Sequence, residues 1–186
     1  MSHDPHSPET RAVHGPRAER TGAVSTPLVH SATFTFDSLE AMVEQQRAGT
    51  AGSFYQRCGH PTVHAAEERL AYLEGAEAGL LFPSGMAAIS TTLLALLHPG
   101  DHVVCVDPCY GGTQGVLAWG EKRFGWSHTF VDSRHPETWE AAFRANTRVL
   151  HLESPINPTL AVFDIAAAAA LGHARGCVVT IDNTIA

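Results

Sequence analysis

From residue 78 onward, short apolar runs alternate with longer amphipathic segments. The runs predict strands at 78–82, 103–106, 128–131, 149–152 and 178–181. The segments between them predict helices at 84–97, 113–124, 137–145 and 164–175. Strands and helices that alternate with short connections are typical of an α/β fold, a mostly parallel sheet with helices on both faces.

The pattern before residue 78 is different. Residues 1–30 are rich in turn formers and lack a hydrophobic period, which predicts an extended arm. Helices are predicted at 38–47, after the capping pair Asp37 and Glu40, and at 62–73. We therefore divide the chain into residues 1–50, an arm with one helix, and residues 51–186, the main domain.

Composition and charge narrow the class of protein. The 186 residues are 44% hydrophobic and 17% charged, which excludes a disordered or collagen-like chain. A formal net charge of -7 argues against a nucleic-acid partner. The sequence has no apolar run long enough to cross a bilayer and no apolar signal core, so we expect no membrane partner and a cytoplasmic protein.

The four cysteines, Cys58, Cys105, Cys109 and Cys177, contain no C-x-x-C pair, which favours reduced thiols. His98, His102, Cys105 and Cys109 have spacings that could suit zinc. However, alternation along strand 103–106 would place His102 and Cys105 on opposite faces of the sheet. We therefore predict no metal site.

Ligands of parallel sheets bind at the carboxyl ends of the strands, and one such end carries Ser84-Gly85-Met86. There a strand is predicted to give way to a helix whose first N–H groups and dipole favour an anion such as phosphate. Any glycine at a strand–helix turn would give the same weak signal. The familiar phosphate-loop and dinucleotide motifs are absent from the sequence.

Asp182 ends an apolar strand, where a buried carboxylate needs a cationic partner or dense hydrogen bonding. It is either a residue that fixes a loop or an anion that keeps a ring nitrogen protonated. Tyr110, beside two glycines at another strand end, either packs under a loop or stacks on a planar ligand.

Three further polar residues are candidates. The turn 153–158 places Asn157 over the same edge of the sheet. Tyr55 and Arg57, in a glycine-rich loop, offer a hydroxyl and a guanidinium to a phosphate, although Arg57 could equally be a solvated charge. Taken together, an aromatic stack, a carboxylate for a ring nitrogen and a phosphate cradle indicate pyridoxal 5′-phosphate (PLP) as cofactor.

Five motifs in order give a resemblance to a known family. They are Tyr55–Thr62, Ser84–Ala88, Tyr110–Thr113, Glu153–Pro158 and Asp182–Thr184. From about residue 26 to its end, the chain resembles the Cys/Met-metabolism (trans-sulfuration) enzymes. This family comprises cystathionine synthases and lyases, methionine γ-lyase and O-acylhomoserine sulfhydrylases.

The resemblance implies a fold type I PLP-dependent transferase-like domain, a dimer of dimers, and a small amino-acid substrate. It also implies roles for individual residues. Tyr55 and Arg57 would reach the phosphate of a neighbouring subunit, and Gly85 and Met86 would bind it through N–H groups. Tyr110 would stack on the ring and is a candidate acid or base. Asn157 would bind the ring oxygen, Asp182 would pair with the pyridinium, and Thr184 would complete the cofactor site.

The chain departs from the family pattern in three places. Gln56 and His60 stand where serine and asparagine are usual, so substrate preference could differ. Gly112 replaces the cysteine characteristic of methionine γ-lyases, which favours the cystathionine enzymes and sulfhydrylases.

The Schiff-base lysine would follow Asp182 by a couple of dozen residues and is absent from the chain. Lys122, the sole lysine, is predicted to face solvent on a helix and cannot replace it. We therefore expect an N-terminal portion of a larger enzyme, incomplete at its C-terminus, with 78–82 as an unpaired strand. Alone, it should be poorly soluble and inactive, and a soluble monomer with γ-elimination activity would contradict this.

Two other hypotheses remain open at this stage. The absent lysine would suit a degenerate, non-catalytic member kept for subunit association, although such a role would not require Tyr110, Asn157 and Asp182. An unrelated α/β nucleotide-binding protein has no phosphate loop in its favour.

Overall fold

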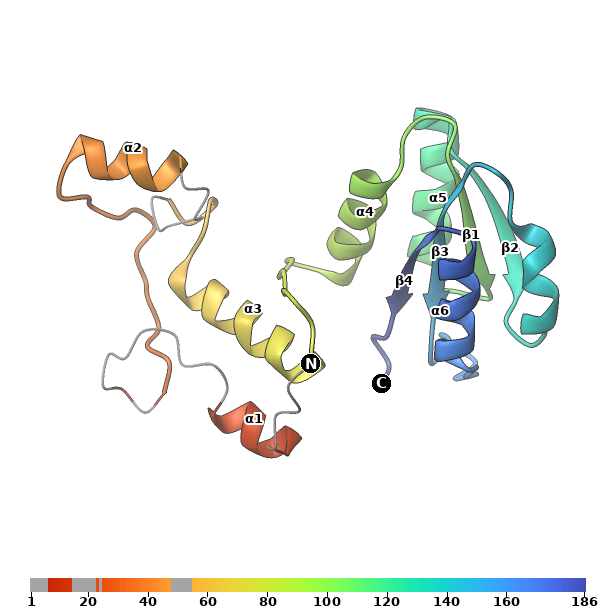
Figure 1. Cartoon of the computed structure of the whole chain (residues 1–186), viewed down its shortest axis with the longest axis horizontal. Helices are drawn as coiled ribbons and strands as arrows, with labels where there is room; N and C mark the ends of the chain where they lie inside the picture. Colours follow the sequence, from red (N-terminus) through yellow and green to blue (C-terminus); the bar gives the residue numbers. More distant parts are fainter. Residues whose placement is uncertain (1–6, 15–22, 24, 48–54) are drawn as a thin grey trace. The chain divides into compact units, whose positions relative to one another are not determined.

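The computed structural model describes residues 7–14, 23, 25–47 and 55–186. Its contacts divide the chain into two compact units, Met1–Leu81 and Phe82–Ala186. Each unit is described by itself (Figure 1). Parts of the expected arm and of the loop that follows residue 47 lie outside the described residues.

The second unit is built on four strands that are all parallel, in the order β2-β1-β3-β4. The strands are β1 (His102–Asp107), β2 (Ser127–Asp132), β3 (Thr147–Glu153) and β4 (Val178–Asp182). Each contains one of the apolar runs predicted to form a strand. The central strand β1 is buried from His102 to Val106, as expected for a strand covered on both faces.

Helices cover both faces of this sheet (Figure 1). On one face, α6 (Ile165–Ala174) approaches closely because Gly172 lies against Leu150 and Val179. On the other face, Glu121 of α5 (Gly111–Phe124) contacts His128 at 3.4 Å. Strand alternation places Leu150 and His128 on opposite faces. The predicted fold class is therefore confirmed.

Side chains fix where the helices begin. Ser84 Oγ accepts from the Ala87 N–H at 3.1 Å and starts α4 (Gly85–Leu96). Asp164 Oδ1 accepts from the Ala167 N–H at 2.9 Å and starts α6. Both helices begin one residue later than predicted, because Ser84 and Asp164 are N-caps rather than helical residues.

Residues 78–82 form no strand, although the expectation that this segment lacks a partner is confirmed. The segment pairs with no strand among the described residues, and Leu80 is 72% exposed. Its Leu81 N–H donates instead to Glu67 Oε1 of α3 (Pro61–Glu74) at 2.9 Å. A side chain thus satisfies a backbone group that a strand partner would otherwise bind.

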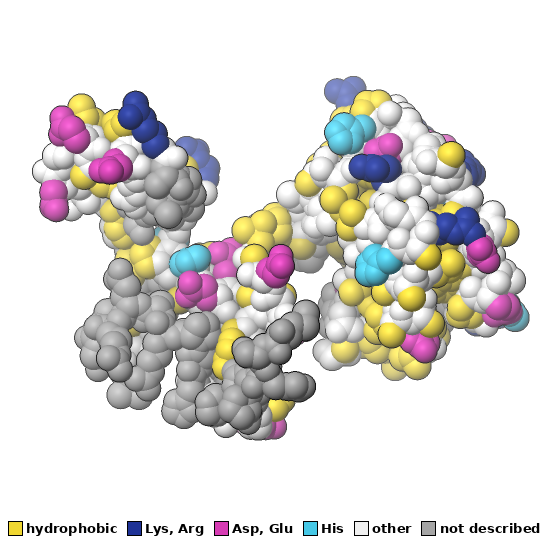
Figure 2. Space-filling view, viewed as in Figure 1, with side chains coloured by type: hydrophobic (Ala, Val, Ile, Leu, Met, Phe, Trp, Pro, Cys, Tyr) yellow, Lys and Arg dark blue, Asp and Glu magenta, His cyan; other side chains and the backbone are white. Residues whose placement is uncertain are grey.

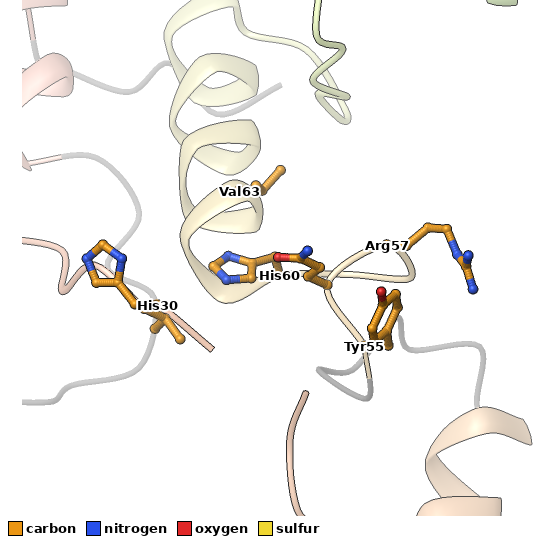
Figure 3. A pocket seen from close by; sticks show the side chains of 7 residues that line it. His30, Tyr55, Arg57, His60 and Val63 are labelled. Carbon is orange, nitrogen blue, oxygen red and sulfur yellow. The ribbon is translucent and has the colours of Figure 1, made fainter. Parts of the chain in front are cut away.

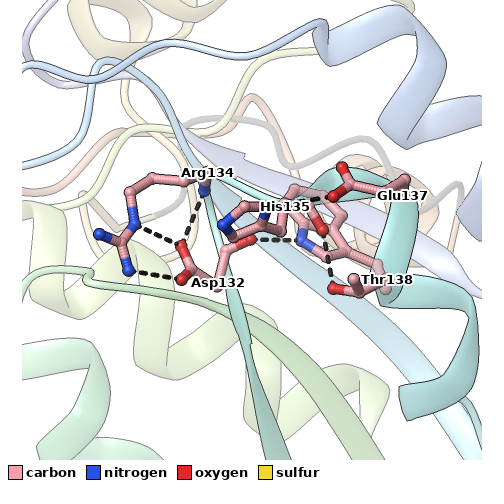
Figure 4. A network of polar contacts seen from close by, with 6 residues as sticks. Asp132, Arg134, His135, Glu137 and Thr138 are labelled. Atoms are coloured by element: carbon pink, nitrogen blue, oxygen red, sulfur yellow. Dashed lines mark hydrogen bonds and ion pairs between the residues drawn. The ribbon is translucent and has the colours of Figure 1, made fainter.

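Two other expectations need correction. The predicted helix 137–145 is a shorter 3₁₀ helix, η1 (Pro136–Ala142). It follows a turn in which Asp132 binds the side chain and N–H of Arg134, and the Asp132 carbonyl accepts from Trp139 Nε1 (Figure 4). The hydrogen bonds from the side chain and the N–H of Arg134 lower the pKa of the Asp132 carboxyl well below its ordinary value.

The expected arm also contains a helix, α1 (Pro8–His14), and the side chain of Arg69 in α3 binds the Ala12 carbonyl at its end. The rest of the first unit contains α2 (Leu39–Arg47), where a helix was predicted, and α3. His60 begins α3, because its Nδ1 accepts from the Thr62 N–H.

Apolar side chains remain on the surface of the second unit, as the hydrophobic patches in Figure 2 show. Leu160, Val162 and Ile165 are exposed before and at the start of α6, and Val178 and Ile181 are exposed on the edge strand β4. Among the helices that the structure describes, none combines the length and apolar character needed to span a membrane.

His102 makes folding dependent on pH. Its ring is buried between Thr147 Oγ1 at 2.8 Å and Thr129 Oγ1 at 2.9 Å. Burial lowers its pKa from 6.5 to about 4, so the folded protein keeps the ring neutral while the unfolded chain protonates it. Stability should be constant above pH 6.5 and fall by up to about 3 kcal/mol as the pH drops to 4.

Urea unfolding between pH 7.5 and 4 tests this dependence. The variant His102→Asn should flatten the slope, whereas His98→Gln, at an exposed ring, should leave it unchanged. Burial lowers the pKa of His151 as well, so part of the slope should remain in His102→Asn. An unchanged slope in His102→Asn would refute the assignment.

Candidate functional site

All four strands end in an acidic residue, and Asp132 ends β2. Glu153 of β3 and Asp182 of β4 are register partners, and Asp107 ends β1. Because the strands are parallel, these carboxyl ends and the loops that follow them lie together. The acidic side chains of the second unit thus lie at the carboxyl ends of the strands, where the sequence predicts the ligand site.

Glu153 is the residue around which the loops at this edge are organised. The residue is buried, with only 3% of its surface exposed. One carboxylate oxygen accepts from the Tyr110 N–H at 2.6 Å, and the other accepts from the Asn157 N–H at 2.7 Å. The carboxylate therefore joins the loop after β1 to the loop after β3. Sequence reasoning noted Glu153 only as part of a turn and missed this role.

Asp182 is half-buried at the end of β4. Its Oδ1 accepts from the N–H of Thr184 at 3.0 Å and from its hydroxyl at 2.5 Å. The strand connects to the loop after β3, because the Ser154 N–H donates to the Asp182 carbonyl at 3.0 Å. Thr184 thus orients one carboxylate oxygen, and no described residue hydrogen-bonds the other, Oδ2, which can receive a cationic group.

The first turn of α4 offers two N–H groups to an anion. The Ala87 N–H is bound by Ser84 Oγ and the Ala88 N–H by the Ser84 carbonyl. The N–H groups of Gly85 and Met86 precede the helical hydrogen-bond ladder and have no acceptor within it. Space beside Gly85 is open, because a Cβ built there would meet no atom within 4 Å. This geometry suits a phosphate.

Gly112 brings Tyr110 and the start of α4 together. A Cβ built at Gly112 would lie 2.6 Å from both Met86 Sδ and Tyr110 Cε1. The Tyr110 ring is therefore next to the anion-binding turn, and 45% of the residue is exposed. An aromatic face, two free N–H groups and a nearby carboxylate can together bind a planar, phosphorylated, nitrogen-containing ring.

The close approach at Gly112 should make it intolerant of a side chain. Gly112→Ala is expected to destabilise the chain by about 1–3 kcal/mol, because the Tyr110 ring or Met86 must move. Gly115→Ala, in the same helix with no atom within 4 Å, should be neutral or stabilising by up to about 1 kcal/mol. Urea unfolding compares the two, and equal effects would contradict the packing described.

Tyr55 and Arg57 belong to the first unit. They lie beside a hollow lined also by Val29, His30, Gln56, His60 and Val63 (Figure 3). The Arg57 guanidinium lies 5.2 Å from the centre of the Tyr55 ring, and no described carboxylate forms an ion pair with it. A guanidinium held on a ring and free of carboxylates can bind an anion.

The remaining chemical groups are placed as follows. Lys122 is exposed in the last turn of α5. His151 is buried on the sheet face that carries Glu153 and Asp182. Its Nδ1 bonds Thr180 Oγ1 at 2.9 Å, whereas its Nε2 has no partner among the described residues. Within the described ranges, no three His, Cys, Asp or Glu side chains are placed to hold a metal ion.

Comparison with known proteins finds relatives among the enzymes of cysteine and methionine metabolism. Residues 9–186 match the family model described as Cys/Met metabolism PLP-dependent enzyme. The chain is 40% identical over 177 residues to L-methionine gamma-lyase of Porphyromonas gingivalis, covering 94% of this chain and 44% of that protein. It is 42% identical over 179 residues to cystathionine beta-lyase MetC of Bacillus subtilis, covering 95% and 43%.

A solved structure shares the fold. An enzyme from Campylobacter jejuni, described as an O-acetylhomoserine (thiol)-lyase, superposes with a TM-score of 0.87 at 30% identity. The match covers 96% of this chain and 45% of that one, and that structure holds N′-pyridoxyl-lysine-5′-monophosphate. The chain thus spans less than half the length of these relatives.

Proposed function

Because the chain belongs to the family of Cys/Met metabolism PLP-dependent enzymes, we propose that it supplies the N-terminal, cofactor-binding part of a trans-sulfuration enzyme. The substrate would be a sulfur amino acid or an O-acylhomoserine. The reaction would be that of a cystathionine synthase or lyase, or of a sulfhydrylase. We call the chain together with the C-terminal part that its relatives possess the complete enzyme.

The observation that carries the proposal is a continuous set of contacts. Asp182 pairs in register with Glu153, and the Glu153 carboxylate binds the N–H groups of Tyr110 and Asn157. Gly112 then brings Tyr110 against Met86 at the start of α4. A carboxylate, an aromatic ring face and an anion-binding turn are thus linked at the carboxyl ends of the strands. PLP needs one such group for each of its ring nitrogen, its ring and its phosphate.

PLP supplies an electron sink when it is bound. In the proposed site, the N–H groups of Gly85 and Met86 hold its phosphate, and Tyr110 covers its ring. The Asn157 side chain binds the ring oxygen. Asp182, oriented by Thr184, keeps a proton on the ring nitrogen. These roles rest on the free N–H groups, on the free Asp182 oxygen and on the exposure of Tyr110 and Asn157.

Assembly into a homo-oligomer, a dimer of dimers, is part of the proposal. Tyr55 and Arg57 would bind the phosphate of a neighbouring subunit. The position of the Arg57 guanidinium over the Tyr55 ring, with no ion pair to a described carboxylate, supports this role. The exposed Gln56 beside them and the half-buried His60 would contribute to substrate preference. A cytoplasmic location is supported by four cysteines that are all free thiols.

Two alternatives are less well supported. The non-catalytic alternative is not favoured, because Tyr110, Asn157 and Asp182 keep an arrangement that subunit association alone does not need. Methionine γ-lyases are among the relatives, but Gly112 stands where the family resemblance places their characteristic cysteine, which favours the cystathionine and sulfhydrylase reactions.

Borohydride reduction of the complete enzyme tests the proposal. We expect an absorbance band from bound PLP that reduction abolishes, and a pyridoxyl group on a lysine beyond residue 186. The Lys122→Arg variant should incorporate the same amount of pyridoxyl group as the wild type, because Lys122 is exposed on α5. The chain alone should show no such band. A pyridoxyl group on Lys122, or none in the complete enzyme, would overturn the proposal.

A further inference from the structure

Two thiols lie beside the candidate site without a role in it. Cys105 lies in β1 and Cys109 in the loop that leads to α5, and their Sγ atoms are 3.8 Å apart. Both are free and buried, with 0% and 6% of the residue exposed. We propose that Cys105 and Cys109 form a reversible disulfide upon reaction with a peroxide, and that this bond displaces Tyr110. The effect on the cofactor site rests on the proposed function.

The disulfide requires only a small movement, and that movement can come from Cys109 alone. A disulfide joins its sulfurs at about 2.05 Å, so the two Sγ atoms must approach by about 1.8 Å. Cys105 is held by β1, which pairs with β2 and β3, its own partners being Phe130 and His151. Cys109 lies outside the strands. The movement therefore falls on the loop of Cys109.

The hydrogen bond between the thiols makes them unequal. It raises the pKa of Cys105 well above its ordinary value, as burial also does, and it lowers the pKa of Cys109, where burial acts in the opposite direction. Cys109 is thus the thiol that more readily becomes a thiolate, the form that reacts with peroxides. It is also the more exposed of the two.

The reaction balances with one peroxide. The Cys109 thiolate attacks a peroxide oxygen, the O–O bond breaks, and a sulfenic acid and hydroxide form. The hydroxide takes up the proton that Cys109 had released. The sulfur of Cys105 then attacks the sulfur of Cys109, the S–S bond forms and the S–O bond breaks. The Cys105 proton leaves with the hydroxide as water. Two thiols lose two electrons, and hydrogen peroxide is reduced to two waters.

Movement of Cys109 reaches the candidate site directly. Tyr110 follows Cys109 in the chain, and its N–H donates to Glu153 at 2.6 Å. Its ring lies close to Gly112, where a built Cβ would be 2.6 Å from Tyr110 Cε1. A shift of the Cys109 loop toward Cys105 therefore moves the Tyr110 N–H that binds Glu153, and in the proposal this bond is lost and the ring is displaced.

Thiol counting on the chain tests the disulfide. The variant Cys58→Ser/Cys177→Ser retains only the proposed pair. After unfolding in denaturant, we expect two alkylatable thiols in the untreated chain, none after hydrogen peroxide, and two again after dithiothreitol. The oxidised chain should be lighter by two hydrogen atoms and remain monomeric on a non-reducing gel. Adding Cys109→Ser should abolish the loss of hydrogen. Two persistent thiols, a stable sulfinic acid or a disulfide between chains would each overturn the proposal.

Hydrogen exchange tests the displacement of Tyr110 without any cofactor. The Tyr110 amide should exchange at least about tenfold faster in the oxidised variant than in the reduced one, because its bond to Glu153 is lost. The Ala87 amide, bound by Ser84, should not change. Equal rates at Tyr110 would refute the switch even if the disulfide forms. Both readouts are independent of PLP, so failure of the proposed function would leave them unaffected.

Discussion

Replacement of Glu153 by alanine is expected to destabilise the chain by about 3–5 kcal/mol. The carboxylate is buried and accepts two short bonds from the N–H groups of Tyr110 and Asn157. Each bond to a charged acceptor contributes about 1.5–3 kcal/mol, and its loss leaves a part-buried N–H without that acceptor. Glu153→Gln should cost about 2–3 kcal/mol, because one oxygen can still accept while the amide NH₂ faces the other N–H group.

Urea unfolding at pH 7.5 measures both variants. Glu140→Gln is the matched control, since Glu140 is an exposed carboxylate that binds Arg175 at the surface. Its effect should stay below about 1 kcal/mol. If Glu153→Ala and Glu140→Gln lowered the free energy of unfolding equally, Glu153 would not be organising the two loops.

Asp182→Asn is expected to lower kcat of the complete enzyme at least about a hundredfold, which corresponds to about 3 kcal/mol in the transition state. An amide carries no charge with which to keep a ring nitrogen protonated, and an unprotonated ring is a poor electron sink. The residue is not part of the hydrophobic core, so the free energy of unfolding should change little.

Two further variants test whether the loss of kcat is specific to the Asp182 carboxylate and to its orientation. Asp132→Asn removes a carboxylate that ends β2, at the opposite edge of the sheet from β4, and pairs with Arg134; it should leave kcat unchanged. Thr184→Val removes the hydroxyl that orients Asp182 and should lower kcat about three- to tenfold. Steady-state kinetics checks both, and equal losses in Asp132→Asn and Asp182→Asn would contradict the specific role of Asp182.

The sequence was sufficient to locate the strands and most helices of the second unit. Its strands are continuous apolar runs because a parallel sheet is buried on both faces, so β1 and β3 can be found without knowledge of their partners. Ser84 and Asp164 cap their helices with their own side chains, and such local signals are visible in sequence.

Features that depend on contacts between distant residues were not predictable. Residues 78–82 have the composition of a strand but need a partner to become one, and Glu67 binds the Leu81 N–H instead. The role of Glu153 depends on two loops that converge on one carboxylate. An acidic residue that ends an apolar strand is the only signal that could have indicated it, and the same signal did single out Asp182.

The protonation of the bound cofactor tests the central claim most directly. The complete enzyme would be loaded with PLP carrying ¹⁵N in its ring, and the nitrogen shift recorded at pH 8 for the wild type and for Asp182→Asn. We predict the shift of a protonated ring in the wild type and that of a neutral ring in the variant. A neutral ring in the wild type, or a protonated ring in Asp182→Asn, would show that another group faces the nitrogen.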